Sequence, residues 1–157
     1  MTLRPALHDT LAAIGTALEA AQEPWWILAG AAAEVLGARE LPAADVDVLI
    51  GLADARRLLP ALGVAEAAPT AHPRYRSVWF GQWRRWPLVV EFMAEFDVRD
   101  PDGEWRPMRQ ATRRAVPIGA TRVFVPDCAE LGAMLERFDR PKDHARIALL
   151  NRLHRGT

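Results

Sequence analysis

The spacing of hydrophobic residues predicts alternating helices and strands along this chain. Over residues 3–18, leucine and isoleucine recur every three or four positions, which predicts an amphipathic helix that ends before Pro24. The apolar run 25–29 indicates a short strand. Gly30 then follows, and we interpret it as a sharp turn into a helix over 31–36.

The same patterns continue to the carboxyl end. They predict strands over 45–50, 74–80, 87–92, 114–118 and 121–125, and helices over 52–62, up to Phe138, and from Pro141 onward. Asp127 with Glu130 three residues later is typical of a capping box at a helix start. The segment 100–103, Asp-Pro-Asp-Gly, predicts a tight turn. Residues 1–157 are therefore expected to form one α/β (α+β) domain, a small mixed sheet with packed helices.

Composition narrows the classes of function. The chain has 157 residues and equal numbers of acidic and basic side chains, so a general electrostatic grip on nucleic acid or anionic membrane is not expected. The single cysteine, Cys128, cannot form an internal disulfide. The sequence shows no signal peptide and no apolar run near the roughly 18 residues of a membrane span. These features favour a cytoplasmic protein.

Two aspartates in one predicted strand are the main candidates for chemistry. Asp45 and Asp47 are two residues apart, so both point to one face while the valines and isoleucine between and after them point to the other. Two such carboxylates repel each other unless a cation lies between them, and oxygen ligands suit Mg²⁺, with Mn²⁺ also acceptable. Glu91, in a strongly apolar strand, is the candidate third ligand because burying an acid without a partner is costly. A strand face with two solvated acids is the alternative.

Several segments together resemble the nucleotidyltransferase superfamily, whose members share a DNA polymerase β-like minimal fold. The first is Trp-Ile-Leu-Ala-Gly-Ala-Ala-Ala-Glu-Val-Leu-Gly-Ala-Arg over 26–39, followed by Asp-Val-Asp-Val-Leu-Ile over 45–50. The end of the chain, from 116–118 through 125–127 to Arg-Pro-Lys-Asp at 140–143, is similar to the closing helices of that family. The small bacterial members include aminoglycoside adenylyltransferases and abortive-infection or toxin–antitoxin nucleotidyltransferases.

The resemblance implies a role for each matching acid. Asp45 and Asp47 would bind the metal ions, and Glu91 would bind one of them and help to activate the hydroxyl of the acceptor. The implied activity is transfer of a nucleoside monophosphate from a magnesium-bound nucleoside triphosphate to an acceptor hydroxyl. A threonine that commonly precedes the aspartate pair is replaced here by alanines 43 and 44.

The resemblance also implies a nucleotide site. Gly30 and the following amide of Ala31 would hold the phosphates at a helix start, and Lys142 would reach the triphosphate. Lys142 is the only lysine among 20 basic residues, and its neighbour Asp143 can pair with Arg146 three residues on. The first glycine of the family's Gly-Gly or Gly-Ser turn is Ala29 in this chain.

A segment rich in tryptophan and arginine makes RNA or another protein a further candidate binding partner. The predicted hairpin Trp79–Trp86 interleaves the two residue types, which suits stacking on RNA or anchoring a protein partner. The alternative is that its aromatic residues pack on the sheet, as aromatic residues commonly do in strands. A second reading of the whole chain keeps the fold but makes it a catalytically degenerate binding or regulatory partner, of the toxin–antitoxin type.

Overall fold

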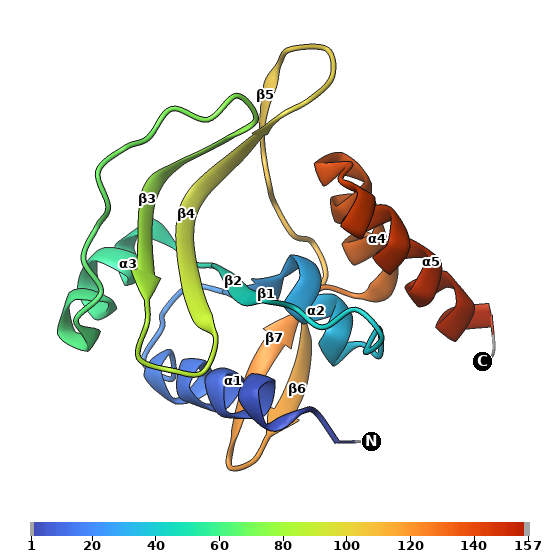
Figure 1. The fold of residues 1–157 in the computed structure, drawn as a ribbon. Helices are drawn as coiled ribbons and strands as arrows, with labels where there is room; N and C mark the ends of the chain where they lie inside the picture. The colour runs from blue at the N-terminus through green and yellow to red at the C-terminus, as the bar shows by residue number, and fades with distance from the viewer. Residues whose placement is uncertain (1, 156–157) are drawn as a thin grey trace.

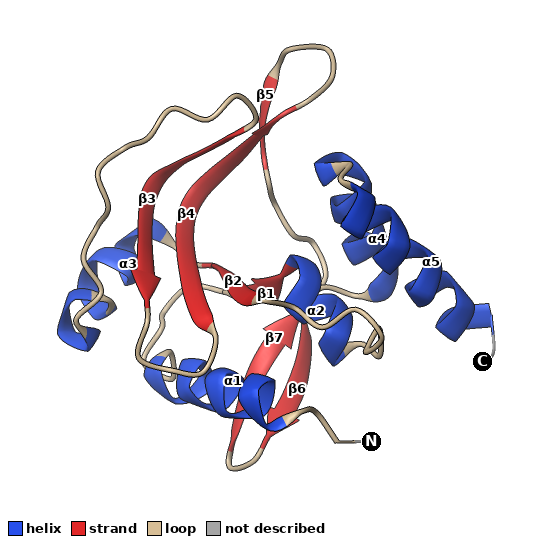
Figure 2. Cartoon of the chain, viewed as in Figure 1, coloured by secondary structure: helices blue, strands red, loops and turns tan. Residues whose placement is uncertain are grey.

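The computed structural model describes residues 2–155 as helices packed on a sheet and a separate hairpin (Figure 1). Figure 2 shows the same elements by type. In chain order they are α1 (Pro5–Ala17), β1 (Trp26–Leu28), α2 (Ala29–Val35), β2 (Asp45–Leu49), α3 (Leu52–Leu58), a 3₁₀ turn (Pro60–Leu62), β3 (Tyr75–Trp83), β4 (Val89–Arg99), β5 (Trp105–Pro107), β6 (Arg114–Ile118), β7 (Thr121–Val125), α4 (Cys128–Phe138) and α5 (Pro141–Arg155).

The main sheet mixes parallel and antiparallel pairs, as predicted. Its strands run in the order β1-β2-β4-β3, and β5 pairs with β4. β2 is parallel to β4, whereas β1 is antiparallel to β2 and β3 is antiparallel to β4. The parallel pairing places Asp47 of β2 directly opposite Glu91 of β4. Two strands that are distant in sequence therefore become neighbours at the centre of the sheet.

Apolar residues from the helices and from the sheet form one core. The largest fully buried side chains include Leu7, Leu11 and Ile14 of α1, Ile27 of β1 and Phe92 of β4. This face of α1 packs against the β6–β7 hairpin. α4 and α5 pack on each other and on α2, and in Figure 1 they stand across from the long strands β3 and β4. No helix in the described part of the chain is long and apolar enough to cross a membrane.

An ion pair between the buried Glu34 and the partly exposed Arg4 fixes the loop that leads into β2. Glu34 of α2 is 2% exposed and accepts hydrogen bonds from the Arg4 guanidinium at 2.8 Å and from the backbone N–H of Ala43 at 2.9 Å. Arg4 also donates to the Ala43 carbonyl. Because Asp45 comes two residues later, this pair ties the start of α1, the end of α2 and the approach to β2 together.

Most predicted elements are present, with different boundaries. The helix expected over 52–62 ends at Leu58, and Pro60 begins a separate 3₁₀ turn that closes at Gly63, whose φ of +81° suits glycine. The second strand of the hairpin continues seven residues beyond its predicted end, to Arg99. The capping box is half formed. The Asp127 side chain accepts from the Glu130 N–H at 2.8 Å, but the Glu130 carboxylate accepts from the backbone N–H groups of 111 and 112 instead.

Candidate active site

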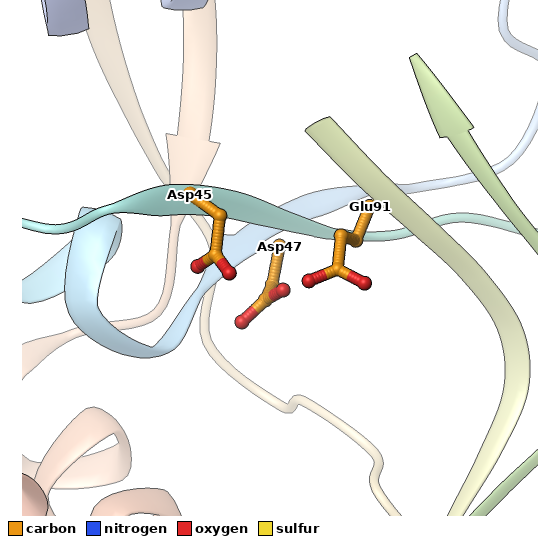
Figure 3. A group of neighbouring side chains, drawn as sticks. All are labelled: Asp45, Asp47 and Glu91. Atoms are coloured by element: carbon orange, nitrogen blue, oxygen red, sulfur yellow. The ribbon is translucent and has the colours of Figure 1, made fainter. Parts of the chain in front are cut away.

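Three carboxylates converge on the surface of the sheet (Figure 3). Asp45 and Asp47 leave the same face of β2, and Glu91 leaves β4 beside them. One carboxylate oxygen from each lies within 4.8 Å of those from the other two. The local cause is alternation along β2, where Val46 and Val48 are fully buried on the opposite face. These three acids were predicted from the sequence as metal ligands, and the structure brings them together.

The electrostatics of this carboxylate cluster disfavour three negative charges. Burial, followed by the charges of Asp45 and Glu91, raises the pKa of Asp47 to about 7. Burial and the nearby Asp45 also raise the pKa of Glu91, against an opposing hydrogen bond from Gln82. Arg140 and Lys142 act in the opposite sense on Asp47 but do not restore its usual pKa. The cluster is thus short of positive charge.

The donor set fits a hard divalent cation. All three groups are carboxylates, which are the ligands that Mg²⁺ and Mn²⁺ accept, and sulfur or imidazole atoms are absent from the group. A cation held between the oxygens would replace the mutual repulsion with attraction. Asp45, Asp47 and Glu91 are therefore able to hold one or two such ions on the pocket floor.

A short chain of polar contacts orients Glu91. The Gln82 amide on β3 donates to a Glu91 carboxylate oxygen at 3.4 Å, and the Arg84 guanidinium donates to the Gln82 side-chain oxygen at 2.7 Å. Gln82 and Glu91 are opposite each other in the β3–β4 ladder, so their side chains share a face. Gln82 could not be predicted from the sequence, because only the ladder register makes it a neighbour of Glu91.

The carboxylates open into a pocket of about 640 Å³. Its walls come from β1 and α2, from the segment 66–72, from β3 and β4, and from the α4–α5 junction. Five of the residues predicted to bind metal or nucleotide line this pocket, namely Gly30, Asp45, Asp47, Glu91 and Lys142. Ala31 is 1% exposed and does not line it, so only a backbone role is open to that residue.

The turn between β1 and α2 is tight and strained. Ala29, rather than Ala31, begins the helix, and its φ of +53° lies in the left-handed region that favours glycine. Gly30 follows, and a Cβ added there would lie 2.7 Å from the guanidinium carbon of Arg146. Lack of a side chain at Gly30 therefore allows α5 to approach the turn closely.

The α4–α5 junction supplies positive charge to the pocket. Arg140, Lys142 and Arg146 all line it. The expected Asp143–Arg146 pair is wrong, because the fully buried Asp143 carboxylate is taken by the Arg140 side chain at 2.6 and 3.0 Å. Arg140 and Arg146 were both missed as site residues. Arg146 lies four residues after Lys142, so the two share one face of the helix, and this spacing was the signal in the sequence that could have pointed to Arg146.

The tryptophan-rich hairpin is mostly part of the core. Trp79 and Trp83 are 3% and 6% exposed, and Trp83 packs edge-on against Trp86 with ring centroids 5.8 Å apart. The pocket side of the same strand carries Phe80 and the exposed Val78 instead. Stacking of a base on Trp79 or Trp83 would require these rings to leave the core.

Comparison with known proteins identifies the fold. By sequence, the chain matches no family model, and no curated protein is significantly similar to it. By structure, it is similar to a Thermotoga maritima protein assigned as a nucleotidyltransferase, with a TM-score of 0.71, 19% identity and 96% of each chain covered.

Two antibiotic-modifying proteins are also similar in structure. The lincosamide adenylyltransferase LnuA, solved with lincomycin bound, has a TM-score of 0.57 at 12% identity, over 90% of this chain and 94% of its own. The antibiotic-resistance factor ANT(2'')-Ia has a TM-score of 0.57 at 14% identity, over 90% of this chain and 80% of its own. This chain has the nucleotidyltransferase fold.

Proposed function

We propose that this protein transfers a nucleoside monophosphate from a nucleoside triphosphate to an acceptor hydroxyl. The observation that carries the proposal is the convergence of Asp45, Asp47 and Glu91 on one point of a nucleotidyltransferase fold, beside a cationic pocket wall. Bound Mg²⁺ would supply Lewis-acid stabilisation of the charge that grows on the phosphate oxygens. Asp45, Asp47 and Glu91 are the residues that would hold it.

Each residue then has a task in the transfer. Glu91, which Gln82 orients, accepts the proton of the acceptor hydroxyl as the hydroxyl oxygen bonds to the α-phosphorus. The bond from the α-phosphorus to the bridging oxygen breaks, and pyrophosphate leaves with its electron pair. Gly30 permits close approach of the phosphates to the turn, and the Lys142 ammonium offsets their charge.

The structural neighbours suggest which acceptors to test first. LnuA holds lincomycin, and a structure of ANT(2'')-Ia contains adenylyl-2''-tobramycin, so proteins of this fold bind small antibiotics and an adenylylated derivative of one. The wall formed by Phe80, Met93 and Val78 next to Glu91 is apolar, which suits an organic molecule rather than a bare ion.

Binding and transfer can be tested separately. Each of the four nucleoside triphosphates with Mg²⁺ or Mn²⁺ is screened by thermal shift, and at least one pair is expected to raise the melting temperature. An α-labelled triphosphate is then offered with hydroxylated small molecules. Asp45→Ala plus Asp47→Ala should abolish label transfer, whereas the exposed pair Asp9→Ala plus Glu40→Ala should retain it. Label transfer by the first double variant would remove the mechanism.

The strained turn favours one alternative function. Ala29 occupies a left-handed conformation without glycine, which weakens the case for a phosphate-binding turn. In this alternative the fold is kept by a non-catalytic regulatory partner. Absence of triphosphate binding up to about millimolar concentration, an affinity worth only about 4 kcal/mol, together with stable co-purification of one protein, would support that alternative.

A further inference from the structure

Arg146 of α5 is a buried cation in the wall of the pocket. Its residue is 7% exposed, and its Nε atom is buried with no hydrogen-bond partner among residues 2–155. The side chain lines the pocket, and its guanidinium lies against Gly30 at the β1–α2 turn. Burial lowers the pKa of Arg146 below its usual value. Burying a charge in this way costs stability unless something binds it.

The surrounding acids do not complete the coordination of Arg146. Asp143 is held in a bidentate pair by Arg140, and Glu34 is held by Arg4 and the Ala43 N–H. Asp45 and these two acids attract Arg146 through space, whereas Arg140 repels it. The Nε–H of this guanidinium is therefore a donor without a partner in the described chain, and the planar donor set of a guanidinium matches phosphate oxygens.

The strand order gives the pocket two distinct ends. The turn that contacts Arg146 follows β1, on one side of β2, whereas Glu91 comes from β4, on the other side. The aspartates of β2 lie between them. In an in-line displacement the attacking and leaving oxygens are on opposite sides of the phosphorus. If the acceptor enters beside Glu91, the leaving group departs toward Arg146.

We propose that Arg146 binds the two terminal phosphates of the nucleotide, which leave as pyrophosphate. The inference rests on the proposed function and adds a direction to it, with the acceptor at the β3–β4 end and the polyphosphate at the α2–α5 end. Arg146 holds the pyrophosphate portion through its guanidinium, close to the backbone at Gly30. The stability lost by burying this arginine is recovered when the polyphosphate binds.

The test compares three ligands on the full chain with Mg²⁺ present, by calorimetry or by displacement of a fluorescent nucleotide. For Arg146→Met, we expect dissociation constants for pyrophosphate and ATP to rise about 10- to 100-fold, with that for AMP changed less than about twofold. Arg146→Lys should lie between Met and wild type. Arg152→Met, on the exposed face of the same helix, is the matched control and should change none of them.

A stability measurement separates binding from structure. The ligand-free melting temperature of Arg146→Met should equal or exceed that of wild type, because the variant removes a buried charge whose Nε–H has no partner in the described chain. A lower melting temperature with equal losses for all three ligands would show a structural role and overturn the inference. Wild-type affinity for pyrophosphate in Arg146→Met, or no pyrophosphate binding by the wild-type chain, would overturn it as well.

The inference and the proposed function can fail independently. If pyrophosphate binding depends on Arg146 but no label reaches any acceptor, then the transferase proposal fails and the phosphate site stands. If label is transferred while Arg146→Met binds pyrophosphate like the wild type, then the transferase proposal stands and the role of Arg146 is wrong.

Discussion

At the scale of single residues, Asp47 has the most perturbed acid–base chemistry of the candidate site. Burial and two neighbouring carboxylates raise the pKa of Asp47 to about 7. Near neutral pH, the Asp47 carboxyl of the ligand-free protein is therefore partly protonated at the position where a metal ion is proposed to bind. A proton and a divalent cation compete for the same oxygens, because the carboxylate must be ionised to bind the ion. The pKa shift therefore sets the pH range in which metal binding becomes effective.

A pH series with Mg²⁺ tests this competition. Between the ordinary aspartate pKa of 3.8 and about 7, the folded state keeps a proton on Asp47 that the unfolded state has released, so the free energy of unfolding falls as pH rises through this window. The melting-temperature increase caused by Mg²⁺ should consequently be small at pH 5.5 and larger at pH 8. Asp47→Asn should lose most of that pH dependence. An increase of equal size at both pH values would contradict the prediction.

Ala29 offers a second test at this scale. A left-handed φ costs a non-glycine residue about 1 kcal/mol or more, so glycine at this position relieves strain while losing a buried methyl group and gaining unfolded-state entropy. We expect Ala29→Gly to unfold within about 0.5 kcal/mol of wild type. Ala32→Gly, buried in the same helix with ordinary φ, should lose about 1–2 kcal/mol. Urea unfolding measures both, and equal losses would show that the turn is not strained.

At the scale of secondary-structure elements, the Arg4–Glu34 pair joins α1, α2 and the loop before β2. Glu34→Ala leaves the Ala43 N–H without its acceptor and removes the carboxylate partner of Arg4, whose side chain is 33% exposed, so we expect a loss of about 2 kcal/mol in the free energy of unfolding. Glu40→Ala, whose side chain is 78% exposed, is the control and should change it by less than about 0.5 kcal/mol. Denaturant titration measures the free energy of unfolding of the two variants. A similarly small loss in both would show that the Arg4–Glu34 pair does not hold the loop.

The elements themselves were largely predictable from local pattern. The strands over 114–118 and 121–125 have the bounds that alternation predicted, and Asp127 caps α4 as its spacing indicated. The extent of β4 was not predictable, because Glu95, with a φ of +50°, interrupts the regular backbone inside the strand without a glycine to announce it. The short β5 was missed since its three residues gain their strand character only by pairing with β4.

Contacts between distant elements limited the prediction of the site. The aspartate pair on one strand is a local pattern, and Glu91 was found because an acid in an apolar strand is unusual. Gln82 and Arg146 became visible only in three dimensions, through the β3–β4 register and through the approach of α5 to Gly30. The sequence also paired Asp143 with the wrong arginine, because i,i+3 spacing fits both Arg140 and Arg146 in opposite directions along the chain.

At the scale of the whole molecule, the balance of charge argues against a nucleic-acid partner. The chain carries no net charge, and Trp79 and Trp83 are in the core rather than on a stacking surface. Neutralised phosphates give RNA binding a steep salt dependence, and a chain without net positive charge lacks a general electrostatic attraction to phosphates. We therefore expect a filter-binding assay to retain no more single-stranded RNA at about 50 mM salt than at about 200 mM salt. Salt-sensitive retention that Arg84→Ala plus Arg85→Ala removes would contradict this expectation.

The parallel register between β2 and β4 has a consequence for how such a protein can diversify. Because side chains alternate along a strand, a one-residue insertion in β4 before Glu91 would turn that acid into the apolar interior and separate it from Asp47. The segment 64–74 lies outside any regular element and borders the same pocket, so changes of its length leave the ladder in phase. Changes that suit a different proposed acceptor can thereby be confined to one loop, while the three carboxylates are kept under a strict spacing constraint.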